Sequence, residues 1–176
     1  MAVSVVIAGE AGFWVVLVLA LATRYLLGWR RVGTALLLAV PLIDLIVLGA
    51  TVLDLRHGAP AEWAHGLGAA YVGFSVAYGH YLVRWADAHA AHRLAGGPAP
   101  VKPPKYGAAR AAHEWRIFAR TLVGAAITAA LIAGMIALVD DTARTAALTR
   151  WYGTMAWVTG ISLVVAASYT VFPKRR

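Results

Sequence analysis

The chain has 176 residues, of which 61% are hydrophobic and 14% are charged, and its mean hydropathy is +0.69. A soluble globular domain has about 25% charged residues, so this composition excludes an ordinary soluble protein and indicates a membrane protein. The net charge of +8 does not indicate nucleic-acid binding, because the basic residues stand in short runs between apolar segments. The absence of cysteine excludes disulfides, thiolate metal sites and lipidated cysteines.

Five apolar segments are long enough to cross a bilayer as helices, since about 20 apolar residues span its hydrocarbon core. A backbone in lipid must satisfy its own hydrogen bonds, so we expect an all-α fold. The first segment has no Lys or Arg before Arg24, which favours a retained helix over a cleaved signal peptide. We predict a single polytopic membrane helix bundle over residues 1–176, with spans at about 3–27, 34–53, 62–83, 120–139 and 148–172.

Basic residues are distributed unevenly among the connections. Thirteen of the sixteen Lys and Arg residues lie in segments 24–31, 84–120 and 174–176, whereas the alternate connections hold only Arg56, Arg144 and Arg150. Because cytoplasmic connections are enriched in Lys and Arg, this asymmetry predicts an outside N-terminus and a cytoplasmic C-terminus. We therefore expect a multi-pass protein of the inner (cytoplasmic) membrane.

The third segment, residues 62–87, is two-faced when wound as a helix. One third of its circumference carries ionisable and small side chains: Glu62, His65, Gly66, Ala69, Gly73, Ala77, His80, Arg84 and Asp87. The other side carries large side chains: Trp63, Leu67, Tyr71, Phe74, Tyr78, Tyr81, Leu82 and Trp85. A helix in lipid must turn its polar face toward other helices or water. We expect that face to meet a small-residue face of the fourth span, which carries Ala126, Ala130 and Gly134 beside Ala125, Ala129, Ala133 and Ala137.

The long connection after the third span is rich in proline and basic residues. We expect the third helix to run past Ala91 and end at Gly96 and Gly97, followed by an extended cytoplasmic loop at about 92–107. A new helix then starts near Gly107. Basic residues near a membrane attract anionic lipid headgroups, and the candidates here are Lys102, Lys105, Arg110, Arg116 and Arg120.

The run HYLVRWADAHAAHRLAGGPAPVKPPKYG, residues 80–107, resembles a segment of small multi-pass bacterial membrane proteins that have no known activity. The resemblance covers the end of the third helix and the loop, and the Pro-Pro-Lys-Tyr-Gly core is its most distinctive part. It implies an inner-membrane protein and assigns no functional residue.

Ionisable residues within the apolar segments are the candidates for chemistry. Asp44 lies near the middle of the second span, where a charged carboxylate costs roughly 2.5 to 3.5 kcal/mol and so must be paired, protonated or hydrated. Acidic and histidine side chains at successive depths are the ingredients of a proton or cation path. The path candidates are Glu10, Asp44, Asp54, Glu62, His65, His80, Arg84 and Asp87. The alternative is that Asp44 bonds a neighbouring helix and the others are interfacial charges.

Three functional hypotheses follow. The first is a small transport-type or ion-coupled protein, the second a non-catalytic scaffold or accessory subunit, and the third a membrane enzyme at the cytoplasmic face. The enzyme hypothesis requires convergence of His89, His92, His113 and Glu114, which are weak metal-ligand candidates because no HExxH or histidine box is present. We expect no cofactor and no nucleic-acid partner; the expected partners are the lipid bilayer and a second copy or another membrane protein.

Overall fold

A computed structural model describes residues 11–12, 15–16, 18–24 and 27–173. Every regular element in this part of the chain is an α-helix, so the predicted all-α fold is confirmed. Residues 18–24 belong to an N-terminal helix, and four long helices follow: α2 (Arg30–Arg56), α3 (Trp63–Ala95), α4 (Gly107–Val139) and α5 (Thr142–Val171). Among the described helices, α4 and α5 are long and apolar enough to cross a membrane.

Helices α3 and α4 extend well beyond the predicted spans. Each has 33 residues, which corresponds to about 50 Å of helix. The predicted end of the third helix is confirmed, because Gly96 adopts a left-handed conformation with φ 64° that terminates α3. The predicted start of α4 at Gly107 is also confirmed. The irregular connection between these two ends comprises residues 96–106, within the loop predicted at about 92–107, and His92 belongs to the last turns of α3.

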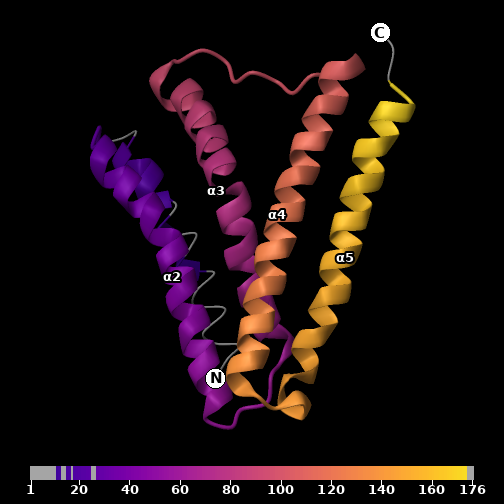
Figure 1. The fold of residues 1–176 in the computed structure, drawn as a ribbon. Coiled ribbons are helices and arrows are strands. Elements are labelled where there is room, and N and C mark those ends of the chain that lie inside the picture. Colours follow the sequence, from indigo (N-terminus) through magenta and orange to yellow (C-terminus); the bar gives the residue numbers. More distant parts are fainter. Residues whose placement is uncertain (1–10, 13–14, 17, 25–26, 174–176) are drawn as a thin grey trace.

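Helices α2 and α3 and the α4–α5 pair converge at one end and diverge toward the other (Figure 1). Helices α4 and α5 stay in contact up to the far end, where Trp115 Nε1 donates to Thr170 Oγ1 at 3.0 Å. The loop 57–62 and the turn between α4 and α5 lie where the helices converge, which we call the closed end. At the opposite, open end, residues 96–106 cross from α3 to α4 (Figure 1). The turn at the closed end is tight: Asp140 adopts φ 50° and ψ 38°, and the Asp141 side chain caps α5 by accepting from the Arg144 N–H. Helix α5 therefore starts before the predicted position 148.

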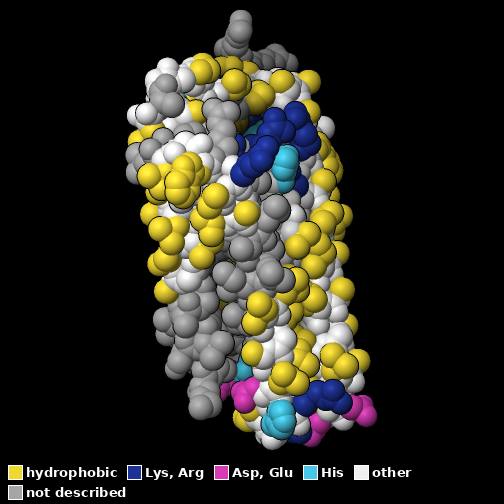
Figure 2. Space-filling model, turned by 90° about the vertical axis from the view of Figure 1, so that its left-hand side faces the viewer, with side chains coloured by type: hydrophobic (Ala, Val, Ile, Leu, Met, Phe, Trp, Pro, Cys, Tyr) yellow, Lys and Arg dark blue, Asp and Glu magenta, His cyan; other side chains and the backbone are white. Residues whose placement is uncertain are grey.

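The buried apolar core lies in the closed half and draws on all four long helices. Its members are Leu48, Leu55, Ala69, Ala70, Val72, Ala125, Ile132, Met135, Leu148, Trp151 and Met155. Large apolar side chains remain exposed on α5, where Trp157 is 74% exposed. On the face shown in Figure 2, the coloured side chains in the middle are mostly hydrophobic, while charged side chains gather toward the two ends. Such a surface suits a bilayer, because the hydrocarbon core can contact the apolar middle of the protein while the polar headgroups contact its charged ends.

Helices α3 and α4 are in close contact at Gly73. A Cβ atom there would lie 2.3 Å from Thr128 Oγ1 and 2.7 Å from the Gly124 carbonyl oxygen, so only glycine fits. The α3 half of the predicted contact is correct. The α4 half is wrong for Ala126, Ala130 and Gly134, which are exposed, whereas Ala125 beside them is buried. An alanine-rich helix offers four-residue spacing in several registers, so the spacing does not identify the face. Here Gly124 and Thr128 form the contact.

Candidate functional site

His65 is buried at the closed end, where it caps the start of α3. The residue is 2% exposed, and its Nδ1 accepts a hydrogen bond of 2.7 Å from the backbone N–H of Glu62. These two residues form a capping box. Because Nδ1 is the acceptor, the neutral ring carries its proton on Nε2. That buried Nε2 has no hydrogen-bond partner among the described residues. Two of the predicted path residues are thus adjacent in a helix cap.

Arg144, near the start of α5, joins three elements at the closed end. Its guanidinium donates to the carbonyl oxygen of Leu55, at the end of α2, where the helix dipole favours a positive charge. Its own carbonyl oxygen accepts from the N–H of Ala61 at 2.8 Å. Farther along α5, Trp151 Nε1 donates to the carbonyl oxygen of Trp63 at 3.2 Å. These contacts fasten α2, α3 and α5 to one another.

Two charged candidates in the open half also make contacts between helices. Asp87 of α3 pairs with Arg24 of the N-terminal helix, at 2.9 Å between Oδ2 and Nη2. The Arg120 guanidinium of α4 lies 4.6 Å from the ring centroid of Tyr81 in α3, a cation–π contact. Asp87 and Arg120 therefore link neighbouring helices.

The remaining path candidates do not gather around a common centre in the described structure. His80 and Arg84 are exposed on the open half of α3, and Asp54 is exposed near the end of α2. Glu10 lies outside the described residues. Asp44 lies in the middle of α2, but its side chain is outside the described part of the structure.

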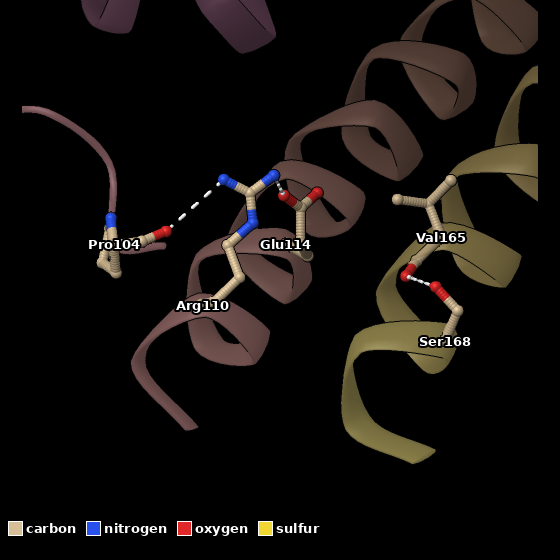
Figure 3. A network of polar contacts seen from close by, with 5 residues as sticks. All are labelled: Pro104, Arg110, Glu114, Val165 and Ser168. Carbon is tan, nitrogen blue, oxygen red and sulfur yellow. Dashed lines mark hydrogen bonds and ion pairs between the residues drawn. The ribbon is translucent and has the colours of Figure 1, made fainter. Parts of the chain in front are cut away.

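The predicted lipid-binding residues differ in what they contact. The Arg110 guanidinium pairs with Glu114, which is 6% exposed, and reaches toward the Pro104 carbonyl oxygen at 3.5 Å (Figure 3). It also lies 4.8 Å from the ring centroid of Tyr169 in α5. Arg110 therefore ties the connection, α4 and α5 together. Three other candidates are exposed to the surroundings: Lys102, Lys105 and Arg116.

The histidines near the open end are engaged locally. The Nδ1 atoms of His89 and His92 lie 2.8 Å from the carbonyl oxygens of Trp85 and Gly97, respectively. Within the described ranges, no group of three or more His, Cys, Asp or Glu side chains is placed to hold a metal ion. His89, His92, His113 and Glu114 thus do not converge as the enzyme hypothesis requires.

The comparison with known proteins places the chain in a family. It is 39% identical over 167 residues to the uncharacterized membrane protein YmcC of Bacillus subtilis (strain 168), a match covering 94% of this chain and 89% of the relative. The chain belongs to the YmcC family of membrane proteins. No protein-family model and no solved structure matches the chain. The predicted resemblance to uncharacterised bacterial membrane proteins is confirmed, and membrane localisation with it.

A hydroxyl cluster in this YmcC-family protein was missed by the sequence analysis. Tyr78 of α3 shares a hydrogen bond of 2.7 Å with Thr121 of α4, and Ser162 of α5 donates to Thr121 at 3.5 Å. Thr121 is 5% exposed. Tyr78 and Tyr81 lie on the helix face that was predicted to be opposite the polar residues, yet both contact α4. When two helices cross at an angle, the side of each helix that touches its neighbour changes along its length.

The arrangement supports helix fastening more directly than chemistry. Most described polar clusters of this YmcC-family protein join two or three helices, whereas the His65 cap and the contacts of His89 and His92 stay local. None of these clusters combines a nucleophile, a base and an oxyanion donor. The sequence does contain a signal for the α3–α4 contacts, because the hydroxyl side chains of Thr121 and Thr128 lie in the otherwise apolar second half of α4, residues 121–139.

Proposed function

We propose that the protein spans the inner membrane five times, with its N-terminus outside and its C-terminus in the cytoplasm. The lengths of α2 to α5, the apolar middle of the surface and the distribution of Lys and Arg support this topology. The open end then faces the cytoplasm and the closed end faces outward.

Single cysteines can test this topology, because the chain contains no cysteine of its own. An impermeant thiol reagent on intact cells should label cysteine at Gly58 or Asp141 and leave Pro100 unlabelled; the reverse result means an inverted orientation.

The function best supported is that of a non-catalytic membrane scaffold or accessory subunit. One observation carries this proposal: the described ionisable side chains at the helix interfaces fasten helices. Arg144 joins α2 and α5, Asp87 joins α3 to the N-terminal helix, and Arg110 joins α4 and α5. A scaffold needs a rigid membrane part and a part presented to a partner. In this structure α3 and α4 reach beyond the predicted spans at the open end and carry residues 96–106 between them.

Transport is the second candidate, and one observation favours it. The buried Nε2 of His65 has no partner among the described residues, and a ring whose donor is unsatisfied is suited to bind water or a proton acceptor. Asp44 in the middle of α2 is the other residue that a proton path requires.

Flux measurements separate these two functions. Protein reconstituted into vesicles with an internal pH-sensitive dye should show the proton leak of empty vesicles, in the wild type and in Asp44→Asn alike. A wild-type flux at least tenfold above empty vesicles that is abolished by Asp44→Asn would instead establish transport. His65→Asn tests the same path at the closed end.

A positive test of the scaffold role uses the size of the native assembly. We expect the protein, extracted from its own membranes in mild detergent, to migrate as a complex larger than the purified chain. Replacing residues 90–113 by a short Gly-Ser linker should release the shortened chain from that complex. Cysteine labelling of Gly58 and Asp141 in the shortened chain shows whether it still inserts correctly. An unchanged complex would contradict a scaffold role for the open end.

Anionic lipid is a further proposed partner, at the level where the spans meet the cytoplasm. Arg116 is exposed and follows Trp115, a residue 41% exposed, as expected for a pair in the headgroup layer. Each basic side chain near the surface contributes about 1 kcal/mol of attraction to an anionic membrane.

A further inference from the structure

Residues 96–106, which we call the strap, connect α3 and α4 at the open end without regular secondary structure. The middle of the strap is solvent-exposed, and Val101, an apolar residue, is 97% exposed. Both lysines, Lys102 and Lys105, are exposed as well. The fold thus keeps an apolar and basic segment on its surface, with its middle uncovered.

The strap is held at both ends. At its start, the Gly97 N–H donates to the Ala91 carbonyl oxygen at 3.0 Å, and the Gly97 carbonyl oxygen lies 2.8 Å from His92 Nδ1. Near its end, the Pro104 carbonyl oxygen faces Arg110, which Glu114 holds in place (Figure 3). A segment fixed at both ends loses less conformational entropy when a partner binds its middle.

The strap sequence favours a polyproline II helix. Four of its eleven residues are proline, which fixes φ near −65° and restricts the residue before it to extended conformations. This helix has three residues per turn, so residues three apart share an edge. Pro100 and Pro103 share one edge, Val101 and Pro104 the second, and Lys102 and Lys105 the third. Two adjoining apolar edges and one basic edge result.

The length of the helices decides between a lipid and a protein partner, given the topology and scaffold role proposed above. Helix α4 continues from the predicted membrane boundary at Arg120 back to Gly107, about 20 Å of helix, and α3 continues a similar distance past Val83. The headgroup layer is about 5–7 Å thick on each side of the hydrocarbon core. The strap therefore lies about 10 Å beyond the headgroups, which exceeds the reach of a lysine side chain and disfavours a membrane surface as its partner.

We propose that the strap is the docking segment for a cytoplasmic protein domain that reads polyproline II helices through an aromatic-lined groove. Such grooves accept Pro-x-x-Pro segments, and Pro100 and Pro103 have that spacing. Acidic side chains beside the groove complement Lys102 and Lys105, since the strap contains no acidic residue. This inference names the partner class of the proposed scaffold.

Photo-crosslinking of the full-length protein in its native membranes tests the proposal. With benzoylphenylalanine in place of Val101, we expect a discrete protein adduct whose yield falls at least tenfold in the Pro100→Ala/Pro103→Ala double variant. The matched control is Pro60→Ala, in the loop at the closed end, which should leave the adduct unchanged. The crosslinked partner, once identified and purified, should bind wild-type protein in nanodiscs at least tenfold more tightly than the double variant.

Three outcomes overturn the proposal: no discrete adduct, adducts with lipid alone, or a protein adduct insensitive to the two prolines. The scaffold role is tested separately by the loss of the native complex when residues 90–113 are replaced. If that complex is lost but Val101 gives no proline-dependent adduct, the scaffold role stands and the docking segment is wrong. If the complex persists without residues 90–113, the scaffold role itself fails.

Discussion

Replacing Gly73 by alanine tests the close contact between α3 and α4. The added methyl carbon would lie 2.3 Å from Thr128 Oγ1, 2.7 Å from the Gly124 carbonyl oxygen and 2.9 Å from the Thr128 nitrogen. Two of these atoms belong to backbone, so α3 and α4 must separate by roughly 1 Å to restore normal van der Waals distances. Overpacking of this kind costs about 1–3 kcal/mol.

Gly79→Ala is the matched control, because it is in the same helix and a Cβ there meets nothing within 4 Å. Alanine improves the helix propensity at both positions by up to about 1 kcal/mol, so this gain cancels when the two variants are compared. Gly73→Ala should therefore be about 1–3 kcal/mol less stable than Gly79→Ala. Unfolding by sodium dodecyl sulfate in mixed micelles, followed by tryptophan fluorescence, measures the difference. Equal stability of the two variants would refute the close packing of α3 and α4.

The same titration checks four further predictions. Ala130→Leu should leave stability unchanged within about 0.5 kcal/mol, because Ala130 is exposed and the substitution is on the surface. Tyr78→Phe should cost about 0.6 kcal/mol, the typical contribution of a hydrogen bond between membrane helices. Trp151→Phe should cost about 0.5–1.5 kcal/mol, because it removes the hydrogen bond from the indole of α5 to the Trp63 carbonyl oxygen. Asp87→Asn should cost at most about 1 kcal/mol, and much less in a background already carrying Arg24→Gln, because the pair is partly exposed.

The elements of this fold were more predictable than their contacts. Gly96 and Gly107 fixed the ends of α3 and α4 in advance, because glycine and proline act on the local backbone whatever surrounds it. Helix lengths followed from the same residues. Local signals of this kind do not depend on which helix becomes a neighbour.

Which faces of two helices meet depends on where and at what angle the helices cross. The sequence of one helix does not specify that crossing. The small residues of α4 occur in several registers, so Gly124 could be chosen over Ala126 only once α3 was placed beside it. The hydrogen bond between Tyr78 and Thr121 was not predicted for the same reason. The sequence does indicate how deep each ionisable residue lies along its helix. It does not indicate the partner, and Asp87 pairs with Arg24, which is distant in the sequence.

The fastening of α2, α3 and α5 at the closed end gives the molecule a mechanical asymmetry. Side chains of Arg144 and Trp151 hold that end, while the far ends of α3 and α4 stand apart and are joined through the strap. Over about 50 Å of helix, a rotation of about 5° at the fastened end displaces the tip by about 4 Å. A force applied to the strap therefore acts with a long lever arm on the contact between Tyr81 of α3 and Arg120 of α4.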